Sequence, residues 1–389
     1  MLTRPAQAAL RAPRVFTSVR AGMRLLAVVV AAVTLGLGVG RGGETPLDAE
    51  ATRAATPAPV ATPDGPVAPR EVRLTVGVSG DLLPHLPVVA RARALAGGRG
   101  YDFRPLLRPI RRWVRRNSLA FCHIETPLTP APPAGYPRFS SPPALARAVS
   151  ATGFDACSTA SNHTLDRGQA GIDATRRSLT RAGVRHTGSF SSRRQQRRPL
   201  LLRARGVKVA FLAYTQMTNG IPPPHSWSVN LARAGRILRD ARRARRAGAR
   251  VVIVNLHWGS EYRHAPDAFQ TRLATRLARS RLINAVVGQH AHVVQPIRRV
   301  GRLWVVFGTG NLLSNQTAAC CPAATQDGML VRLHLRVGSH RSRVQRISYT
   351  PTWVRHPEYT VVRAARARRA SWRRTVAVVG RSRRVHPEP

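Results

Sequence analysis

Short apolar runs alternate with longer segments rich in arginine, alanine and leucine from about residue 71 onward. The apolar runs are rich in β-branched residues and too short for helices, which predicts buried strands. They cover Val72–Val78, Leu119–Ile124, Phe154–Ala160, Val207–Ala213, Val251–Leu256, Asn284–Gly288 and Leu303–Phe307. Helices are predicted at Pro143–Ser150, Gln169–Ala182, Leu231–Ala247 and Asp267–Ser280. This repeated alternation predicts an α/β fold.

Two further apolar runs, Met329–Val337 and Val344–Val354, follow each other without a helix between them and predict two more strands. Beyond them the chain is rich in arginine. We therefore expect residues 361–389 to form an exposed helix or an unstructured tail. The folded domain is placed at residues 71–360.

The N-terminal part has the pattern of an export signal. Residues 1–24 contain five arginines and no acidic residue, and residues 25–40 form the apolar run LLAVVVAAVTLGLGVG. A basic flank before an apolar run predicts a signal peptide or an uncleaved signal-anchor, although sixteen residues are fewer than the ~20 that cross a bilayer comfortably. A buried core helix is the alternative. Residues 41–70, rich in proline and alanine, predict an extended linker. We expect an exported protein of the cell envelope, either membrane-anchored or secreted.

The charge is extreme but comes almost entirely from one residue type. The 389 residues have a formal net charge of +46, with 63 basic residues of which only Lys208 is a lysine. A surface selected to bind nucleic acid normally contains both lysine and arginine, because both neutralise phosphate. The near absence of lysine therefore indicates a bias in the nucleotide composition of the gene more than a nucleic-acid surface. No zinc-finger, helix-turn-helix or RNA-binding signature supports nucleic acid as a partner. The charge excludes an acidic disordered chain.

The four cysteines are too few for a disulfide scaffold, and none forms a C-x-x-C pair. Cys122 and Cys157 lie on strands predicted to be adjacent and are interpreted as buried apolar residues. A disulfide between Cys320 and Cys321 would be strained, so these are expected to be free or paired elsewhere. The chain also lacks the nucleophile elbow of serine hydrolases and the phosphate loop of NTPases.

Aspartate, glutamate, asparagine and histidine stand where the predicted strands end. The ends deliver Asp81, Glu125, Asn162 with His163, His257, and His290 with His292. In α/β sheets, ligands bind outside the carboxyl ends of strands. These residue types suit Mn, Fe or Zn. Taken one at a time, each has an ordinary explanation as a helix cap, a core histidine or a turn residue; their coincidence at five strand ends favours a metal site.

The spacing of the histidines and the position of Glu125 suggest more than one ion. His290 and His292 alternate by two, so in an extended segment both imidazoles would face the same way. The two oxygens of Glu125 would allow it to bridge two ions. Two ions ~3.5–4 Å apart form the clamp that enzymes use on phosphoryl oxygens. The pattern therefore predicts two divalent metal ions, of unknown identity among Mn, Fe and Zn.

Six segments in unbroken order resemble the CapA family of bacterial capsule or poly-γ-glutamate synthesis proteins. They are GDLLPH from residue 80, IETP from 124, TASNHTLDRGQAGI from 159, NLHWGSEY from 255, VVGQHAHVVQP from 286 and VFGTGNLLSNQ from 306. The resemblance covers about residues 74–316. It implies a metallophosphatase-like (calcineurin-like) fold, a four-layer α/β/β/α sandwich with its metal site at the carboxyl ends of the strands.

The resemblance also implies roles for individual residues. The metal ligands it implies are Asp81, His85, Glu125, Asn162, His257, His290 and His292. His163 would assist the leaving group, and Asp166 would orient His163. The residues expected to contact substrate are His123, Glu261 and Asn311. His123 stands where the family usually has asparagine.

Two functions follow from this resemblance. The first is an exported metal-dependent hydrolase that acts on a phosphoester-like bond during capsule or poly-γ-glutamate biosynthesis. Its expected partners are a capsule-synthesis complex and the membrane, which residues 25–40 would contact. The second is a non-catalytic component that binds a polyanionic polymer during its export. In the second function, the arginines would matter more than the metal ligands. The helical segment Leu231–Ala247 and the tail after residue 361 supply many of these arginines.

Overall fold

The computed structural model of this chain describes residues 71–339 and 341–388. The predicted basic segment, the signal segment and the linker (1–24, 25–40 and 41–70) lie outside the described residues. Within the described ranges, no helix combines the length and the apolar character needed to cross a bilayer.

The first sheet combines parallel and antiparallel strands in the order β14-β13-β12-β1-β2-β3-β4. Strand β11 pairs with β1, and β15 pairs with β13. Strands β1 to β4 are mutually parallel, whereas the pairs β1–β12, β12–β13 and β13–β14 are antiparallel. Strands β11 and β15 pair in parallel with β1 and β13. The bounds are β1 Val72–Leu82, β2 Leu119–Ile124, β3 Ala156–Ser158, β4 Arg185–Thr187, β11 Asn311–Leu313, β12 Asp327–Val337, β13 Ser342–Arg355, β14 Thr360–Arg363 and β15 Val385–Pro387.

The second sheet has the order β5-β6-β7-β8-β10-β9. Its four central strands are parallel, and β5 and β9 close the two edges in antiparallel pairing. The bounds are β5 Leu200–Ala204, β6 Val207–Thr215, β7 Val251–His257, β8 Ala285–Gln289, β9 Ile297–Val300 and β10 Leu303–Val306.

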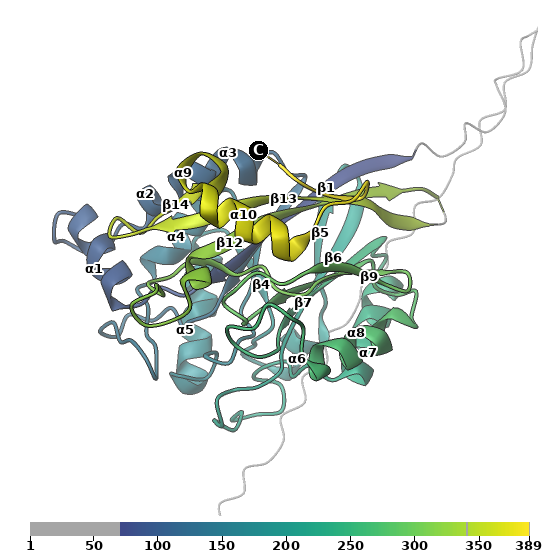
Figure 1. The fold of residues 1–389 in the computed structure, drawn as a ribbon. Helices are drawn as coiled ribbons and strands as arrows, with labels where there is room; N and C mark the ends of the chain where they lie inside the picture. The colour runs from purple at the N-terminus through teal and green to yellow at the C-terminus, as the bar shows by residue number, and fades with distance from the viewer. Residues whose placement is uncertain (1–70, 340, 389) are drawn as a thin grey trace, which may run out of the picture. The chain divides into compact units, whose positions relative to one another are not determined.

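The two sheets pack face to face, and helices cover their outer faces (Figure 1). Phe121 of β2 stacks on Phe211 of β6 between the sheets, with ring centroids 4.2 Å apart. A second apolar cluster lies under α1–α4, and a third lies under α7 and α8. The α/β/β/α sandwich is thus confirmed. The helices are α1 Leu86–Leu95, α2 Arg104–Leu107, α3 Arg111–Arg115, α4 Ala144–Thr152, α5 Gly168–Arg181, α6 Arg193–Arg197, α7 Ala234–Arg246 and α8 Ala268–Ala278.

Most predicted elements are present, with shifted ends. Strand β3 has only three residues, because the chain turns after Ser158 into the loop that contains Asn162. The helix predicted from Leu231 begins at Ala234, because Leu231 forms a β-bridge with Thr215. At the ends of β3 and of α7, contacts with other parts of the chain therefore override the local preference for strand or helix.

The C-terminal segment differs from the expected tail. It forms β14, α9 (Ala364–Ala367), α10 (Arg369–Val379) and β15. Val379 and Val385 are buried in the cluster between the sheets. The carboxylate of Glu388 accepts hydrogen bonds from Arg332, Trp113 and Ser348. The folded domain therefore extends to at least residue 388, because apolar residues among the arginines supply a buried face that arginine content alone does not reveal.

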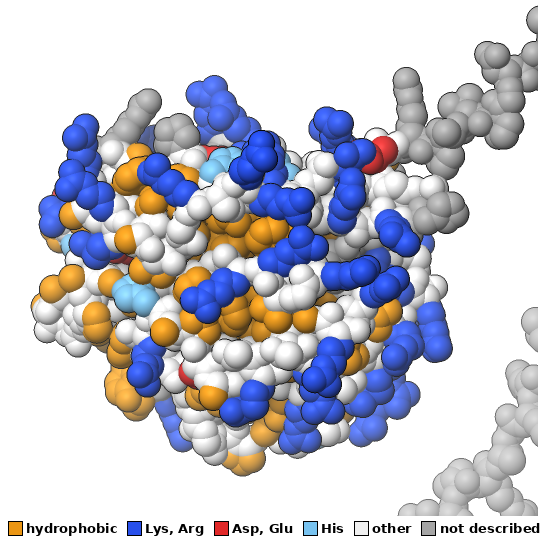
Figure 2. Space-filling model, turned by 45° about the vertical axis from the view of Figure 1, so that its right-hand side comes forward, with side chains coloured by type: hydrophobic (Ala, Val, Ile, Leu, Met, Phe, Trp, Pro, Cys, Tyr) orange, Lys and Arg blue, Asp and Glu red, His pale blue; other side chains and the backbone are white. Residues whose placement is uncertain are grey.

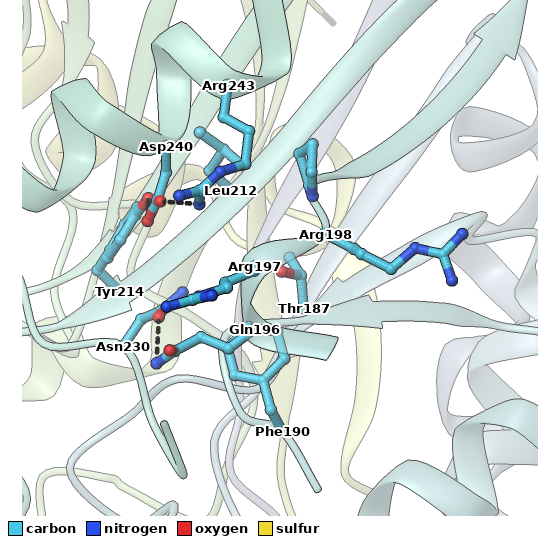
Figure 3. Close-up of a pocket in the computed structure, with 11 residues that line it drawn as sticks. Thr187, Phe190, Gln196, Arg197, Arg198, Leu212, Tyr214, Asn230, Asp240 and Arg243 are labelled. Carbon is cyan, nitrogen blue, oxygen red and sulfur yellow. Dashed lines mark hydrogen bonds and ion pairs between the residues drawn. The ribbon is translucent and has the colours of Figure 1, made fainter. Parts of the chain in front are cut away.

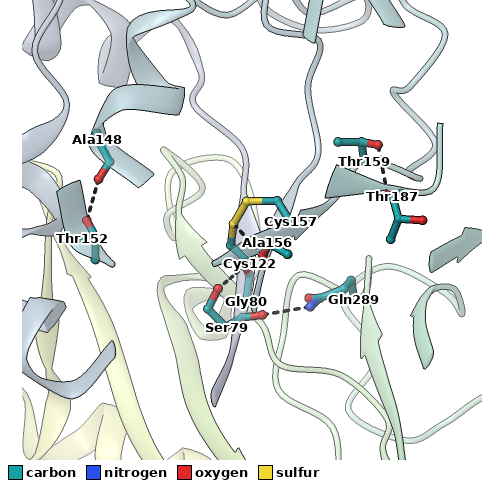
Figure 4. The surroundings of a disulfide bond; sticks show 10 residues. All are labelled: Ser79, Gly80, Cys122, Ala148, Thr152, Ala156, Cys157, Thr159, Thr187 and Gln289. Carbon is teal, nitrogen blue, oxygen red and sulfur yellow. Dashed lines mark hydrogen bonds between the residues drawn. A yellow bond between two sulfur atoms is a disulfide. The ribbon is translucent and has the colours of Figure 1, made fainter. Parts of the chain in front are cut away.

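Cys122 and Cys157 lie directly opposite each other on β2 and β3 and form a disulfide (Figure 4). Both are buried and their strands are adjacent, as predicted. The prediction of buried residues did not include this disulfide, which forms because the parallel register brings the two side chains together. Cys320 and Cys321 are free.

Candidate metal centre

Five strands from the two sheets end at one place and bring the predicted ligands together. Asp81 lies near the end of β1, and Glu125 directly follows β2. His257 ends β7, and His290 directly follows β8. Contacts between the sheets join these ends: the Asp81 Oδ2 atom accepts a hydrogen bond from the backbone N–H of His290 at 3.1 Å. All four side chains are at most 3% exposed.

Seven buried polar atoms of this group have no hydrogen-bond partner. They are Asp81 Oδ1, both carboxylate oxygens of Glu125, both ring nitrogens of His123, and the Nδ1 atoms of His257 and His290. An unsatisfied buried polar atom costs about 1–3 kcal/mol, and native proteins contain few of them. Their concentration in one cluster of acceptors and imidazoles fits cations as the missing partners.

The distances between the donor atoms support this assignment. His292 Nδ1 lies 3.6 Å from Asp81 Oδ2, and His292 Nε2 lies 3.7 Å from Glu125 Oε1. His257 Nε2 is 3.8 Å from the same Glu125 oxygen. Among the described residues, four overlapping sets place three donor atoms within 4.8 Å of one another. The sets are Asp81–His123–His257, Glu125–His257–His290, Glu261–His290–His292 and Asp81–Glu125–His292.

Burial shifts the protonation of these groups strongly. It raises the pKa of Asp81 to about 8 and that of Glu125 well above its usual value. It lowers the pKa of His123 and His290 to about 3 and that of His292 to about 4. The imidazoles are therefore neutral and able to ligate. A bound cation would lower the pKa of both carboxyl groups and favour their charged form.

His290 and His292 converge by a different geometry from the one predicted. Strand β8 ends at Gln289, and the two histidines have positive φ values of 91° and 56°. The prediction of an extended segment is wrong, although the rings do face a common site, with centroids 6.0 Å apart. Left-handed backbone costs non-glycine residues energy and is concentrated at functional sites.

His123 has a different place from the one the resemblance implied. It is fully buried, and its ring stacks on that of His257 with centroids 4.8 Å apart. Its Nε2 atom lies 3.9 Å from Asp81 Oδ1. A side chain without exposed surface cannot line a substrate cleft, so the structure groups His123 with the candidate ligands.

Asn311 is also buried; its side chain contacts other residues of the site and does not face the substrate side. Its Oδ1 atom is 3.0 Å from His292 Nδ1. Its amide nitrogen donates to the side chain of Gln316 and to the carbonyl oxygen of Thr325, both at 2.9 Å. With every polar group used, Asn311 fixes the His292 ring. Glu261, with a side chain 40% exposed, remains at the rim, 4.0 Å from His292.

His85 belongs to none of the four ligand sets. It is half-buried, and its Nδ1 atom lies 3.0 Å from the carbonyl oxygen of Leu83. The ring of Phe139 meets both His85 and His163 edge-on, with centroids 5.4 and 4.7 Å away. His85 therefore lies on the wall of the site, outside the four sets, and its role as a metal ligand stays a prediction.

His163 is positioned as a proton donor or acceptor. Its Nδ1 atom lies 2.8 Å from Asp166 Oδ2, which also accepts the backbone N–H of Phe139 at 2.7 Å. Asp166 thus fixes the ring from behind. Beside it, Asn162 Oδ1 accepts a hydrogen bond from His257 Nε2 at 2.8 Å, so Asn162 joins the ligand group. Sequence reasoning missed Phe139, because its proline-rich loop has no periodic pattern.

The chain is similar to proteins of capsule synthesis. Residues 75–316 match the family described as bacterial capsule synthesis protein PGA_cap. The capsule biosynthesis protein CapA of Bacillus anthracis is 28% identical over 195 residues, which are 49% of this chain and 46% of that protein. The PGA biosynthesis protein CapA of Bacillus subtilis (strain 168) is 25% identical over 185 residues, 47% of each chain. A probable polyglutamine synthesis accessory protein of Mycobacterium tuberculosis (strain H37Rv) is 28% identical over 234 residues, 51% of this chain and 60% of that protein.

These matches span about half the length of the curated relatives. Two solved structures are similar at low sequence identity. A calcineurin-like phosphoesterase of Bacillus subtilis has 14% identity and a TM-score of 0.43, and the match covers 79% of this chain and 96% of that one. The NAD nucleotidase of Haemophilus influenzae has 11% identity and a TM-score of 0.45, with 82% of this chain and 64% of that one covered.

Proposed function

Because the chain belongs to the family of bacterial capsule synthesis proteins, PGA_cap, we propose that it is a metal-dependent hydrolase of a phosphoester-like bond in the synthesis of an anionic capsule polymer. The single observation that supports this most is the cluster of seven unpaired buried polar atoms at the strand ends. The polymer would be poly-γ-glutamate or a chemically similar polyanion.

The residues that would hold two divalent ions (Mn, Fe or Zn) are Asp81, His123, Glu125, Asn162, His257, His290 and His292. Such ions, when bound, supply charge stabilisation for phosphoryl oxygens and a nucleophile at neutral pH. Both carboxylate oxygens of Glu125 lack a hydrogen-bond partner, so this residue would offer two ligand atoms to the ions. Asn311 would keep His292 in orientation.

The other site residues have roles that follow from their contacts. His163, with Nδ1 fixed by Asp166, presents Nε2 as the atom that exchanges a proton with the leaving group. The edge of the Phe139 ring packs against His163 and excludes water from that side. Glu261, the most exposed of the acidic residues here, would contact substrate.

Metal content and ester hydrolysis test this proposal together. We would purify the full chain, measure bound metal, and assay cleavage of bis(p-nitrophenyl) phosphate. His290→Ala should lose both metal and activity. His163→Ala should keep its metal and lose activity by about 100-fold or more. His225→Ala, an exposed histidine outside the site, serves as the control. Full metal occupancy without cleavage of any phosphoester would overturn the hydrolase function.

An exported protein fits one further observation. Disulfides persist in oxidising compartments and are rare in the cytosol, and the Cys122–Cys157 disulfide lies directly behind the site. With the signal-like residues 25–40, it supports a location in the cell envelope, anchored or secreted, within reach of a capsule-synthesis complex.

A second candidate function is binding of a polyanion without catalysis. A groove of about 700 Å³ is lined by Arg176, Arg185 and Arg198, with no acidic residue in its lining. On the face seen in Figure 2, basic side chains are spread widely, with few acidic side chains between them. Removal of metal by a chelator separates the two functions, because it should abolish hydrolysis and leave polymer binding by the arginines intact.

The neighbouring pocket does not extend this groove. Its volume is about 10 Å³, room for about one water molecule. Figure 3 shows Tyr214 donating a hydrogen bond to Asp240 and Gln196 donating one to Asn230. These bonds join its walls, so we assign it a structural role.

A further inference from the structure

Among the described residues, large hydrophobic side chains are exposed at only three positions: Leu86 at 47%, Tyr136 at 83% and Tyr262 at 37%. They come from segments far apart in the sequence, namely the start of α1, the proline-rich loop after β2, and the loop after β7. Exposed apolar residues that gather around a site mark a binding surface, so their places relative to the metal centre matter.

Two of the three lie on one side of the site. Leu86 directly follows His85. The proline-rich loop packs on it, since a side-chain carbon at Gly135 would lie 3.3 Å from Leu86 Cγ. Tyr136 is the next residue. The same loop leads to Phe139, whose ring lies between His85 and His163.

Tyr262 borders the other side of the site. Its ring centroid is 6.2 Å from that of His292, and its backbone is left-handed, with φ of 62°. The Tyr262 hydroxyl accepts a hydrogen bond from Gln316 Nε2 at 3.2 Å. The backbone nitrogen of the preceding residue, Asn315, is 3.3 Å from His85 Nδ1. Residues 315 and 316 therefore lie between Tyr262 and His85, and they link the Leu86 side of the site to the Tyr262 side.

We propose that this apolar rim, made of Leu86, Tyr136 and Tyr262, is a binding subsite for an aliphatic or aromatic group of the substrate. The floor of the site is made of carboxylates and imidazoles, and the divalent cations that it would hold would select an anionic group. Leu86, Tyr136 and Tyr262 carry no charge and would contact the apolar group attached to that anion, whereas the carboxylate of Glu261 lies beside Tyr262 and faces His292. The substrate is therefore amphiphilic close to the bond that is broken. This inference rests on the proposed function only for the place of the anionic group.

The test uses two phosphonates that differ only in their apolar part. Binding of methylphosphonate and butylphosphonate to the full chain, loaded with Mn²⁺, would be measured by calorimetry. Complete burial of one methylene group increases the affinity about fourfold, and burial of half of its surface increases it roughly twofold. Butylphosphonate, with three more methylenes, should therefore bind about tenfold more tightly.

Variants test whether the rim residues cause the difference in affinity between the two phosphonates. In the double variant Leu86→Ala/Tyr136→Ala, the ratio of the two affinities should fall to about one, while the affinity for methylphosphonate stays within about twofold of wild type. Tyr262→Phe keeps the ring and removes only the hydroxyl, so its ratio should stay near ten; Tyr262→Ala should lower it.

The outcomes separate this inference from the function on which it rests. Equal affinities for the two phosphonates in the wild-type chain would overturn the rim subsite and leave the metal-dependent function standing. A tenfold ratio that survives the double variant would also overturn it. If neither phosphonate binds the Mn²⁺-loaded chain, both the anion site and the rim are wrong.

Discussion

Hydrogen bonding, and not burial, separates candidate ligands from supporting residues at this site. His123 and Asn311 have side chains that the sequence assigns equally well to substrate contact, and both are fully buried. His123 leaves both ring nitrogens unpaired, whereas Asn311 uses its whole amide group on protein partners. The first is therefore suited to a cation and the second to holding a ligand in place.

Asn311→Ala should weaken metal binding without removing a ligand. Loss of an outer-shell hydrogen bond to a metal-binding histidine typically costs 10–100-fold in metal affinity, and Asn311 makes that bond to His292. We expect a fall of about that size in the Mn²⁺ affinity, measured by competition with a chelator. His225→Ala should bind Mn²⁺ as wild type does. Unchanged affinity in Asn311→Ala would show that the His292 ring needs no such support.

His186, a histidine outside the metal centre, is expected to make the free energy of unfolding depend on pH. Burial, and then the charges of Arg176 and Arg185, lower its pKa to about 3. The unfolded chain takes up this proton near pH 6.5, whereas the folded chain does not until about pH 3. Stability is therefore lost as the pH falls through this window, with a slope of about 1 kcal/mol per pH unit.

His186→Gln should flatten this slope. Urea unfolding at several pH values between 6.5 and 4 would measure it for both proteins, with metal held constant. The slope is the decisive quantity, because a uniform loss of stability would reflect only the lost contact with Arg176. An unaltered slope would mean that His186 titrates normally in the folded chain.

At the scale of elements, the disulfide joins two strands whose ends form the site. Cys122 precedes His123 on β2, and Cys157 lies on β3, which leads to Asn162 (Figure 4). Titration of the denatured protein with a thiol reagent should find two free thiols without reductant, from Cys320 and Cys321, and four with it. Four free thiols without reductant would contradict the pairing.

The C-terminal elements are expected to be necessary for folding. A chain that ends at residue 360 loses α10 and β15, including the buried Val379 and Val385. Each buried valine contributes about 2 kcal/mol, and the Glu388 contacts with Arg332 and Trp113 are lost as well. We expect an insoluble protein or one with a much lower thermal midpoint. Arg383→Ala, at an exposed position, should melt as wild type does; a soluble, unshifted truncation would refute the requirement.

At the scale of the whole molecule, the net charge of +46 and the metal centre are separate features. Arginines are spread over the surface (Figure 2), whereas the site consists of histidines, carboxylates and amides. Exposed charges are screened over about 8 Å at physiological ionic strength, but buried ligands are not.

Salt should therefore separate the two candidate functions. Binding of poly-γ-glutamate to the surface should fall steeply between about 50 and 200 mM salt, as for other polyanions. Metal content should stay constant over the same range. Both would be followed on one sample, by co-sedimentation with the polymer and by elemental analysis. Salt-independent polymer binding would mean that the arginines are not the binding surface.

The alternation of apolar runs by itself determined the α/β class and most central strands, since buried parallel strands need continuous apolar sequence wherever they stand. The residues at the strand ends, such as Asp81 and His257, could also be predicted, because parallel strands must deliver their ends to one edge. The tertiary structure alone decided which of them converge in one buried cluster, that Cys122 pairs with Cys157, and that the arginine-rich C-terminus is part of the fold. Each of these depends on contacts between segments far apart in the chain, and local sequence patterns do not encode such contacts.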